Sequence, residues 1–200
     1  MGFFDFLFGR KSTVETLNDR IWLTEAARWK GLREELRKQA AVCSGVLLVA
    51  QFPDTRDALV PLVDEVDGYC EVRLASELSS DVASYWPGVE SQPAFVLVAE
   101  RHPLRAHDDR IIAFAGELPC KAQVVFHLSL EDALLKVFIG QQIEELLRRM
   151  GMDENESIDS NMVSRRIAAA QKKIASQAFG DSDARSAADW LAANVPGLNQ

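Results

Sequence analysis

A short, uninterrupted run of apolar residues constrains the fold of this chain more than any other feature. Residues 46–50 are Val-Leu-Leu-Val-Ala, with a glycine immediately before them. A strand with one face in water would alternate apolar and polar side chains, so an unbroken run predicts a strand buried on both faces. Such strands are typical of parallel sheets covered by helices on each side. We therefore expect an α/β fold.

The flanking segments fit this expectation. Thr24 is a candidate N-cap for an amphipathic helix that ends before Gly45. Asp54 is a candidate N-cap for a second helix, which Pro61 is expected to kink or split. Residues 76–92 carry loop-forming residues and are predicted to be mainly loop. Further strands are predicted at residues 71–74, 94–99, 111–115 and 123–128.

Two helices are predicted after the last strand. Ser129 and Asp132 approximate a capping box, and apolar residues at helical spacing then continue to a stop at Gly151. A last long helix is expected from about Ser160 to Gly180. Strands alternating with helices, followed by helices alone, predict a doubly wound, mainly parallel sheet of about five strands with a long C-terminal helical extension.

Composition limits the classes of function. The net charge is −8, which argues against nucleic acid as the main partner, because phosphate binding needs a basic surface. Cys43, Cys70 and Cys120 are odd in number and form no Cys-x-x-Cys pair, so neither a disulfide framework nor a zinc site is indicated. No apolar run approaches the ~20 residues that span a bilayer. A cytoplasmic protein is expected.

The first eleven residues form a phenylalanine-rich segment that ends in two basic residues. It is too short for a secretory signal and lacks a small-residue cleavage site. As a helix it would suit an interfacial anchor at the inner face of the plasma membrane, or it could dock on the protein's own core or on a neighbouring copy. The predicted membrane or partner contacts are Phe3, Phe4, Phe6, Leu7, Phe8, Arg10 and Lys11.

The last third of the chain carries a specific resemblance. Residues 125–138 are Val-Phe-His-Leu-Ser-Leu-Glu-Asp-Ala-Leu-Leu-Lys-Val-Phe, followed by Leu-Arg-Arg-Met-Gly-Met at 147–152 and Val-Ser-Arg-Arg-Ile at 163–167. This series resembles the end of the second motor domain of SecA, the bacterial preprotein translocase ATPase, where that domain runs into the helical scaffold. Residues 100–102, Glu-Arg-His, are similar to the family's Thr-Glu-Arg-His. The resemblance covers roughly residues 21–179.

The resemblance implies a domain organisation and a structural loop. It implies a RecA-like domain at residues 21–151, preceded by an amphipathic segment at 1–20 and followed by a scaffold-like helical tail at 152–200. Glu100, Arg101 and His102 would form a structural loop, in which Glu100 and Arg101 serve a structural ion pair.

Two pairs of polar residues near that loop leave alternatives open. His102 and His107, near Asp108 and Asp109, could serve a metal or acid–base role, or could be solvated polar loop residues.

Farther along, His127 lies in an apolar strand and is predicted to be a core or sheet-edge histidine with its hydrogen bonds satisfied.

Departures from the family pattern weigh against catalysis. The family continues after Glu-Arg-His through an arginine-rich motif that faces the γ-phosphate, and here residues 110–119 are Arg-Ile-Ile-Ala-Phe-Ala-Gly-Glu-Leu-Pro. An arginine finger contributes roughly 10³ to 10⁵ in the rate of phosphoryl transfer. A family glycine-rich loop is excised between Leu74 and Ala94, and the chain lacks a G-x-x-x-x-G-K-[ST] loop. We predict neither ATPase activity nor a bound cofactor.

The leading hypothesis is therefore a non-catalytic, SecA-like protein that binds another protein and acts as an accessory or regulator in translocation. Its partner would be SecA, another part of the translocation machinery, or a second copy. Two alternatives are a nucleotide-binding subunit that completes an ATPase site in trans, and a self-associating structural protein. A basic helical region either is solvated or contacts an acidic partner; its residues are Arg148, Arg149, Arg165, Arg166 and Lys172.

Overall fold

The computed structural model of the chain describes residues 14–89, 91–139, 156–159, 161–195 and 197. Its centre is a 6-stranded sheet with the order β1-β6-β5-β3-β4, in which β2 also pairs with β6. Every pairing between these strands is parallel. The strands are β1 (Val14–Thr16), β2 (Arg20–Trp22), β3 (Gly45–Ala50), β4 (Cys70–Leu74), β5 (Ala94–Val98) and β6 (Ala122–Ser129).

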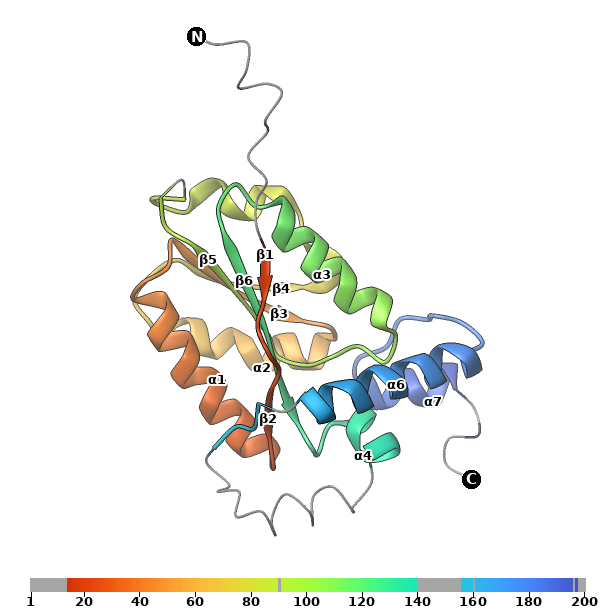
Figure 1. Cartoon of the computed structure of the whole chain (residues 1–200). Coiled ribbons are helices and arrows are strands. Elements are labelled where there is room, and N and C mark those ends of the chain that lie inside the picture. Colours follow the sequence, from red (N-terminus) through yellow and green to blue (C-terminus); the bar gives the residue numbers. More distant parts are fainter. Residues whose placement is uncertain (1–13, 90, 140–155, 160, 196, 198–200) are drawn as a thin grey trace.

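Helices cover both faces of the sheet (Figure 1). Two 3₁₀ helices, Ala75–Glu77 and Ser80–Tyr85, lie in the connection between β4 and β5. The α-helices are α1 (Glu25–Ala40), α2 (Pro53–Val63), α3 (Arg105–Glu117), α4 (Ala133–Ile139), α6 (Asn161–Gln177) and α7 (Ala187–Asn194). The expected α/β fold with a parallel sheet and C-terminal helices is thus confirmed.

Two buried clusters of apolar side chains hold these layers together. On one face, Leu36 of α1 and Leu59 of α2 pack against the sheet. On the other face, Ile111 of α3, Ile167 of α6 and Trp190 of α7 share one cluster with the strands. The helices of the predicted tail therefore contribute to the same core as the sheet, and each large buried side chain stabilises this packing by about 1.5–3 kcal/mol.

Local signals in the sequence account for most helix boundaries. The Thr24 side chain accepts a hydrogen bond from the Ala27 amide at 3.1 Å, as expected for the cap of α1. The N-cap position of α2 is Phe52, so Asp54 lies in the first turn and was wrongly predicted as the cap. Pro61 stays inside an unbroken α2, where the loss of one amide donor near the end of a helix has little effect.

The strand predicted at residues 111–115 is wrong. These residues form the second half of α3, and Ile111, Phe114 and Ala115 are its buried positions. Their spacing of three and four residues is helical, but a short apolar run does not by itself separate strand from helix. The sheet instead gains β1 and β2, each of 3 residues, from the segment around residues 14–22. Strands this short carry too few positions to show an alternating pattern.

His127 is buried in β6, but its predicted hydrogen bonds are not there. Neither ring nitrogen has a hydrogen-bond partner within the described part of the chain. The ring stacks on Trp22 with centroids 6.3 Å apart. Burial lowers the pKa of His127 to about 3, and the charges of Arg20 and Arg28 act in the same direction. His127 is therefore a neutral core side chain.

The hydrogen bonds of the predicted capping box are present at the end of β6, but Ser129 is the last residue of β6 and α4 begins only at Ala133. The Ser129 amide donates to the Asp132 carboxylate at 2.9 Å, and the Ser129 hydroxyl accepts from the Glu131 amide at 3.0 Å. The described helix that follows is α4, and the predicted stop at Gly151 lies outside the described residues. The last long helix is present as α6.

Candidate functional site at the carboxyl edge of the sheet

The carboxyl ends of β3 and β5 meet at the point where the strand order reverses. The chain leaves β3 toward β4 on one side and returns to β5 on the other. In doubly wound sheets, ligands bind in the crevice at this position. Here the crevice holds Glu100, whose carboxyl oxygen accepts hydrogen bonds from the amides of Gln51 and Phe52, each at 3.2 Å. The side chain of Thr55 also hydrogen-bonds to this group.

A cavity of about 450 Å³ opens beside Glu100. The amino ends of α1, α2, α4 and α7 all contribute to its lining. Such helix ends attract anions, but carboxyl groups of the chain already lie at several of these ends. Glu131 accepts from the Glu25 amide of α1 at 2.7 Å, and Asp132 precedes α4. Carboxyl groups of the protein itself thus lie at these helix ends.

Arg28 is a part of this site that sequence reasoning missed. Its side chain is buried and donates to the Ala99 carbonyl at 2.9 Å and to the Asp132 carboxylate at 3.0 Å. It also pairs with Glu25 at 3.2 Å. On the sequence, Arg28 follows Ala27 on a helix that also carries Arg33 and Arg37, so no local signal distinguishes it. Its position neutralises the acidic edge of the cavity.

Arg101 is the centre of a buried ion-pair network. Its guanidinium contacts Asp19 at 2.6 Å and Asp108 at 2.9 Å. It also lies 3.9 Å above the centroid of the Phe126 ring, a favourable cation–π distance. Asp19 in turn accepts a hydrogen bond from Ser164 of α6 at 3.0 Å. Within the described ranges Glu100 forms no ion pair, and backbone amides hold its carboxyl group instead.

Asp108 accepts hydrogen bonds from four donors in three different segments of the chain. One oxygen accepts from Gln51 at 2.9 Å and from the His102 amide at 3.0 Å. The other accepts from Arg101 at 2.9 Å and from Gln171 of α6 at 2.7 Å. Asp108 is 1% exposed, so it is not a solvated loop residue as one interpretation of the sequence held. The carboxylate joins β3, β5, α3 and α6 in one network.

His102 and His107 come together with Asp181, a residue 74 positions after His107. The two rings stack with centroids 3.7 Å apart and planes at 22°. His107 Nε2 lies 2.7 Å from the Asp181 carboxylate. His102 also stacks on Phe52 and meets Trp190 edge-on, each with ring centroids 5.1 Å from its own. The cluster therefore fastens the segment before α7 to the carboxyl edge of the sheet.

The geometry of this cluster does not suit a metal ion. The His102 Nδ1 atom accepts the Leu104 amide at 3.0 Å, so in the neutral ring Nε2 carries the proton and has no lone pair to give. An ion bonded to both rings must also lie in both ring planes, and stacked planes at 22° converge far beyond a metal–nitrogen bond of about 2 Å. Burial, followed by the charge of His107, lowers the pKa of His102 to about 3.

Glu100→Gln is expected to change how stability depends on pH. Burial raises the pKa of Glu100 from an ordinary value of 4.5 to about 7. As the pH rises, the unfolded chain releases the Glu100 proton at a lower pH than the folded chain does. The stability contributed by protonated Glu100 is therefore complete below about pH 4.5 and is lost as the pH rises to about 7. The amide does not titrate, so the variant should gain stability relative to the natural protein across that interval, on the order of 3 kcal/mol.

Urea unfolding at a series of pH values between 4 and 8 measures this difference. The matched control is Glu117→Gln, which changes an exposed glutamate on α3. Comparing each variant with the natural protein cancels the opposite effect of the buried histidines, whose neutral forms are favoured at higher pH. A Glu100→Gln difference that stays constant with pH would contradict the assignment.

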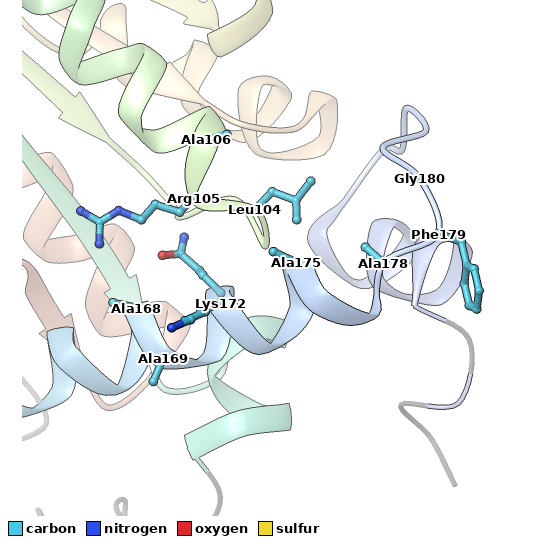
Figure 2. Close-up of a pocket in the computed structure, with 11 residues that line it drawn as sticks. Leu104, Arg105, Ala106, Ala168, Ala169, Lys172, Ala175, Ala178, Phe179 and Gly180 are labelled. Carbon is cyan, nitrogen blue, oxygen red and sulfur yellow. The ribbon is translucent and has the colours of Figure 1, made fainter.

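A second concave surface lies between the amino end of α3 and α6 (Figure 2). This groove has a volume of about 840 Å³ and is lined by Leu104, Arg105, Ala106, Ala168, Ala169, Gln171, Lys172, Ala175, Ala178, Phe179 and Gly180. Most of these side chains are apolar. Phe179 at one end of the groove is 84% exposed, an unusual position for a large aromatic ring.

The structure places part of the predicted basic face beside this groove. Arg165, Arg166 and Lys172 are exposed on α6, and Lys172 lines the groove. They form no ion pair with any residue in the described ranges. Some predicted contacts lie outside the described residues: Arg148 and Arg149 of the basic face, and Phe3, Phe4, Phe6, Leu7, Phe8, Arg10 and Lys11.

No helix among the described residues combines the length and the apolar character needed to cross a bilayer.

Comparison with known proteins relates part of the chain to one family. Residues 75–155, which include Glu100, Arg101 and His102, match the SecA P-loop domain. Protein translocase subunit SecA 1 of Rhodopirellula baltica is 35% identical over 118 residues, which are 59% of this chain and 9% of that protein.

Two further relatives agree with this match. Protein translocase subunit SecA of Campylobacter concisus is 40% identical over 85 residues, and that of Nitratiruptor is 39% identical over 85 residues; each alignment covers 42% of this chain and 10% of the relative. The chain spans about a tenth of the length of these curated relatives. It is a partial relative of the P-loop motor region of SecA.

Proposed function

We propose that this chain is a non-catalytic relative of the second motor domain of SecA that acts by binding another protein, in an accessory or regulatory role in protein translocation. The observation that carries this proposal is the position of Glu100. Its carboxyl group takes the backbone amides at the switch point of the sheet, where a doubly wound fold would bind a phosphate group. A triphosphate there would have to displace a buried side chain.

The covering of the same edge by α7 supports the proposal. Ser186, Ala187 and Ala188 at the start of α7 line the cavity beside Glu100, and Trp190 packs against His102. Arg185 also pairs with Asp54 of α2 at 2.6 Å, which holds this segment over the edge. A second motor domain that approached to complete a nucleotide site would meet this segment first.

Nucleotide titration tests the non-catalytic part. Isothermal titration of the full chain with ATP and Mg²⁺ is expected to give no saturable heat, and adding the chain to SecA from the same organism should leave the heat that SecA alone gives unchanged. The turnover of that SecA should not require this chain, and SecA alone is the positive control. Saturable ATP binding by this chain, or ATPase activity that appears only on mixing with a partner of low activity, would instead support a subunit that completes the site in trans.

A further inference from the structure

We propose that the groove between α3 and α6 binds an amphipathic helix with acidic flanks from another protein. This inference deepens the proposed function, because it assumes that the chain acts by binding and names the surface and the chemistry of the partner. The shape of the groove, its charge and the exposed ring of Phe179 all suit such a partner.

The shape of the groove suits a helix. Its floor is formed by side chains of α6 with few atoms, Ala168, Ala169 and Ala175, and Leu104 forms part of the opposite wall (Figure 2). Small side chains let a second helix approach closely, within the 8–10 Å that is typical between packed helices. The apolar face of an amphipathic helix buries its large side chains in a groove of this kind.

The charge around the groove is opposite to that of the chain as a whole. α6 carries Arg165, Arg166, Lys172 and Lys173 and has no aspartate or glutamate, whereas the net charge of the chain is −8. On the other wall, Arg105 is 63% exposed and its pair with exposed Asp109 is 3.4 Å long, so that pair neutralises it only weakly. An apolar floor between cationic walls complements a helix whose apolar face is bordered by glutamate or aspartate.

Phe179 provides an anchor at one end of the groove. The ring is 84% exposed although the residue follows partly buried Ala178, and its amide is held by the Asn194 carbonyl at 2.9 Å. This hydrogen bond holds the backbone of Phe179 in place, so a partner can bury the ring without rearranging the chain around it. Large aromatic residues at such positions contribute a large share of binding energy in protein interfaces.

The same observations argue against two other occupants. A second copy joined through this face would bring two α6 helices together, and each carries only cations. An anionic membrane would satisfy the charge, but a flat lipid surface does not fill the floor of a groove between two helices. The features together therefore favour a helix from a different, acidic partner.

A designed peptide tests the inference with the full chain. The probe is a fluorescein-labelled peptide of about five helical turns, ~18 residues, with leucine along one face and glutamate beside it. One control peptide has the same residues in shuffled order, and another has lysine in place of glutamate. Fluorescence anisotropy should show saturable binding of the first peptide alone, which weakens as salt is added.

Two pairs of matched variants locate the binding. Ala175→Glu places a carboxylate in the groove, and Lys172→Glu reverses a charge on its wall; each should weaken peptide binding by about tenfold or more. Their controls are Ala113→Glu on α3 and Lys38→Glu on α1, which change exposed residues away from the groove and should leave binding within about twofold. Circular dichroism checks that all four variants fold.

Each other outcome overturns the inference. Equal binding of the three peptides, or equal effects of groove and control variants, would show that the groove does not select an acidic amphipathic helix. Sedimentation of the chain with phosphatidylglycerol vesicles, lost in Lys172→Glu, combined with no peptide binding would assign the face to a membrane. Self-association that Ala175→Glu abolishes would assign it to a second copy. None of these results depends on ATP binding, whose detection would overturn the proposed function instead.

Discussion

Asp108→Asn is expected to lower the free energy of unfolding by about 3–5 kcal/mol, the range found when one partner of a buried ion pair is removed. The asparagine keeps the shape of the side chain but replaces one acceptor oxygen by an NH₂ group. In either orientation that group faces two donors, either Gln51 and the His102 amide or Arg101 and Gln171. Among the residues described, Arg101 would then keep only Asp19 as an anionic partner.

Urea unfolding followed by circular dichroism measures this effect. Asp109→Asn is the control, because Asp109 is the next residue on α3, is 56% exposed and contacts only Arg105, at 3.4 Å, among the residues that the structure describes. Its effect should stay within about 0.5 kcal/mol. Equal stabilities of the two variants would show that the four hydrogen bonds to Asp108 do not hold the helices to the sheet.

Trp190→Ala is expected to release α7 from the carboxyl edge of the sheet. Trp190 is 1% exposed, packs edge-on against His102 and donates a hydrogen bond to Asp181 at 3.0 Å. Removing a buried tryptophan side chain costs about 3–5 kcal/mol. α7 has 8 residues and its other buried residues are Leu191 and Asn194, so this loss should exceed what keeps the helix docked.

Hydrogen exchange followed by mass spectrometry distinguishes local release from global unfolding. Amides of residues 187–194 should lose protection in Trp190→Ala, while those of β3, β5 and β6 keep most of theirs, because α7 lies at the end of the core and can open alone. Tyr85→Ala removes an aromatic ring that is 82% exposed and should leave both groups of amides unchanged. Protection retained at α7 after loss of Trp190 would refute a docking role for that ring.

The strands and helices with strong local signals could be predicted from the sequence. Residues 45–50 form a fully buried strand as their unbroken apolar run indicated, and Thr24 caps α1 through its own side chain. Residues 111–115 were wrongly predicted as a strand because the apolar run is short and the polar first half of α3 precedes it. β1 and β2 were missed because pairing with β6, more than one hundred residues later, defines them rather than their own pattern.

The candidate site could be located only in part. The resemblance singled out Glu100, Arg101 and His102, and all three lie at the carboxyl edge of the sheet, but their partners are distant in the sequence. Glu100 meets amides 48 and 49 residues away, and Arg101 meets Asp19 82 residues away. Contacts of this kind follow from the topology of the sheet, so neither periodicity nor composition contains a signal for them.

The position of β1 and β2 has a consequence for solubility. Both strands run along the outer side of β6, whose 8 residues are almost entirely buried and include Val124, Val125, Phe126 and Leu128. Without this cover, β6 would present a long apolar border with free amides and carbonyls to any other extended chain, the arrangement from which aggregates grow. Besides burying a modest area, these two strands of 3 residues thus protect the protein from aggregation through the edge of β6.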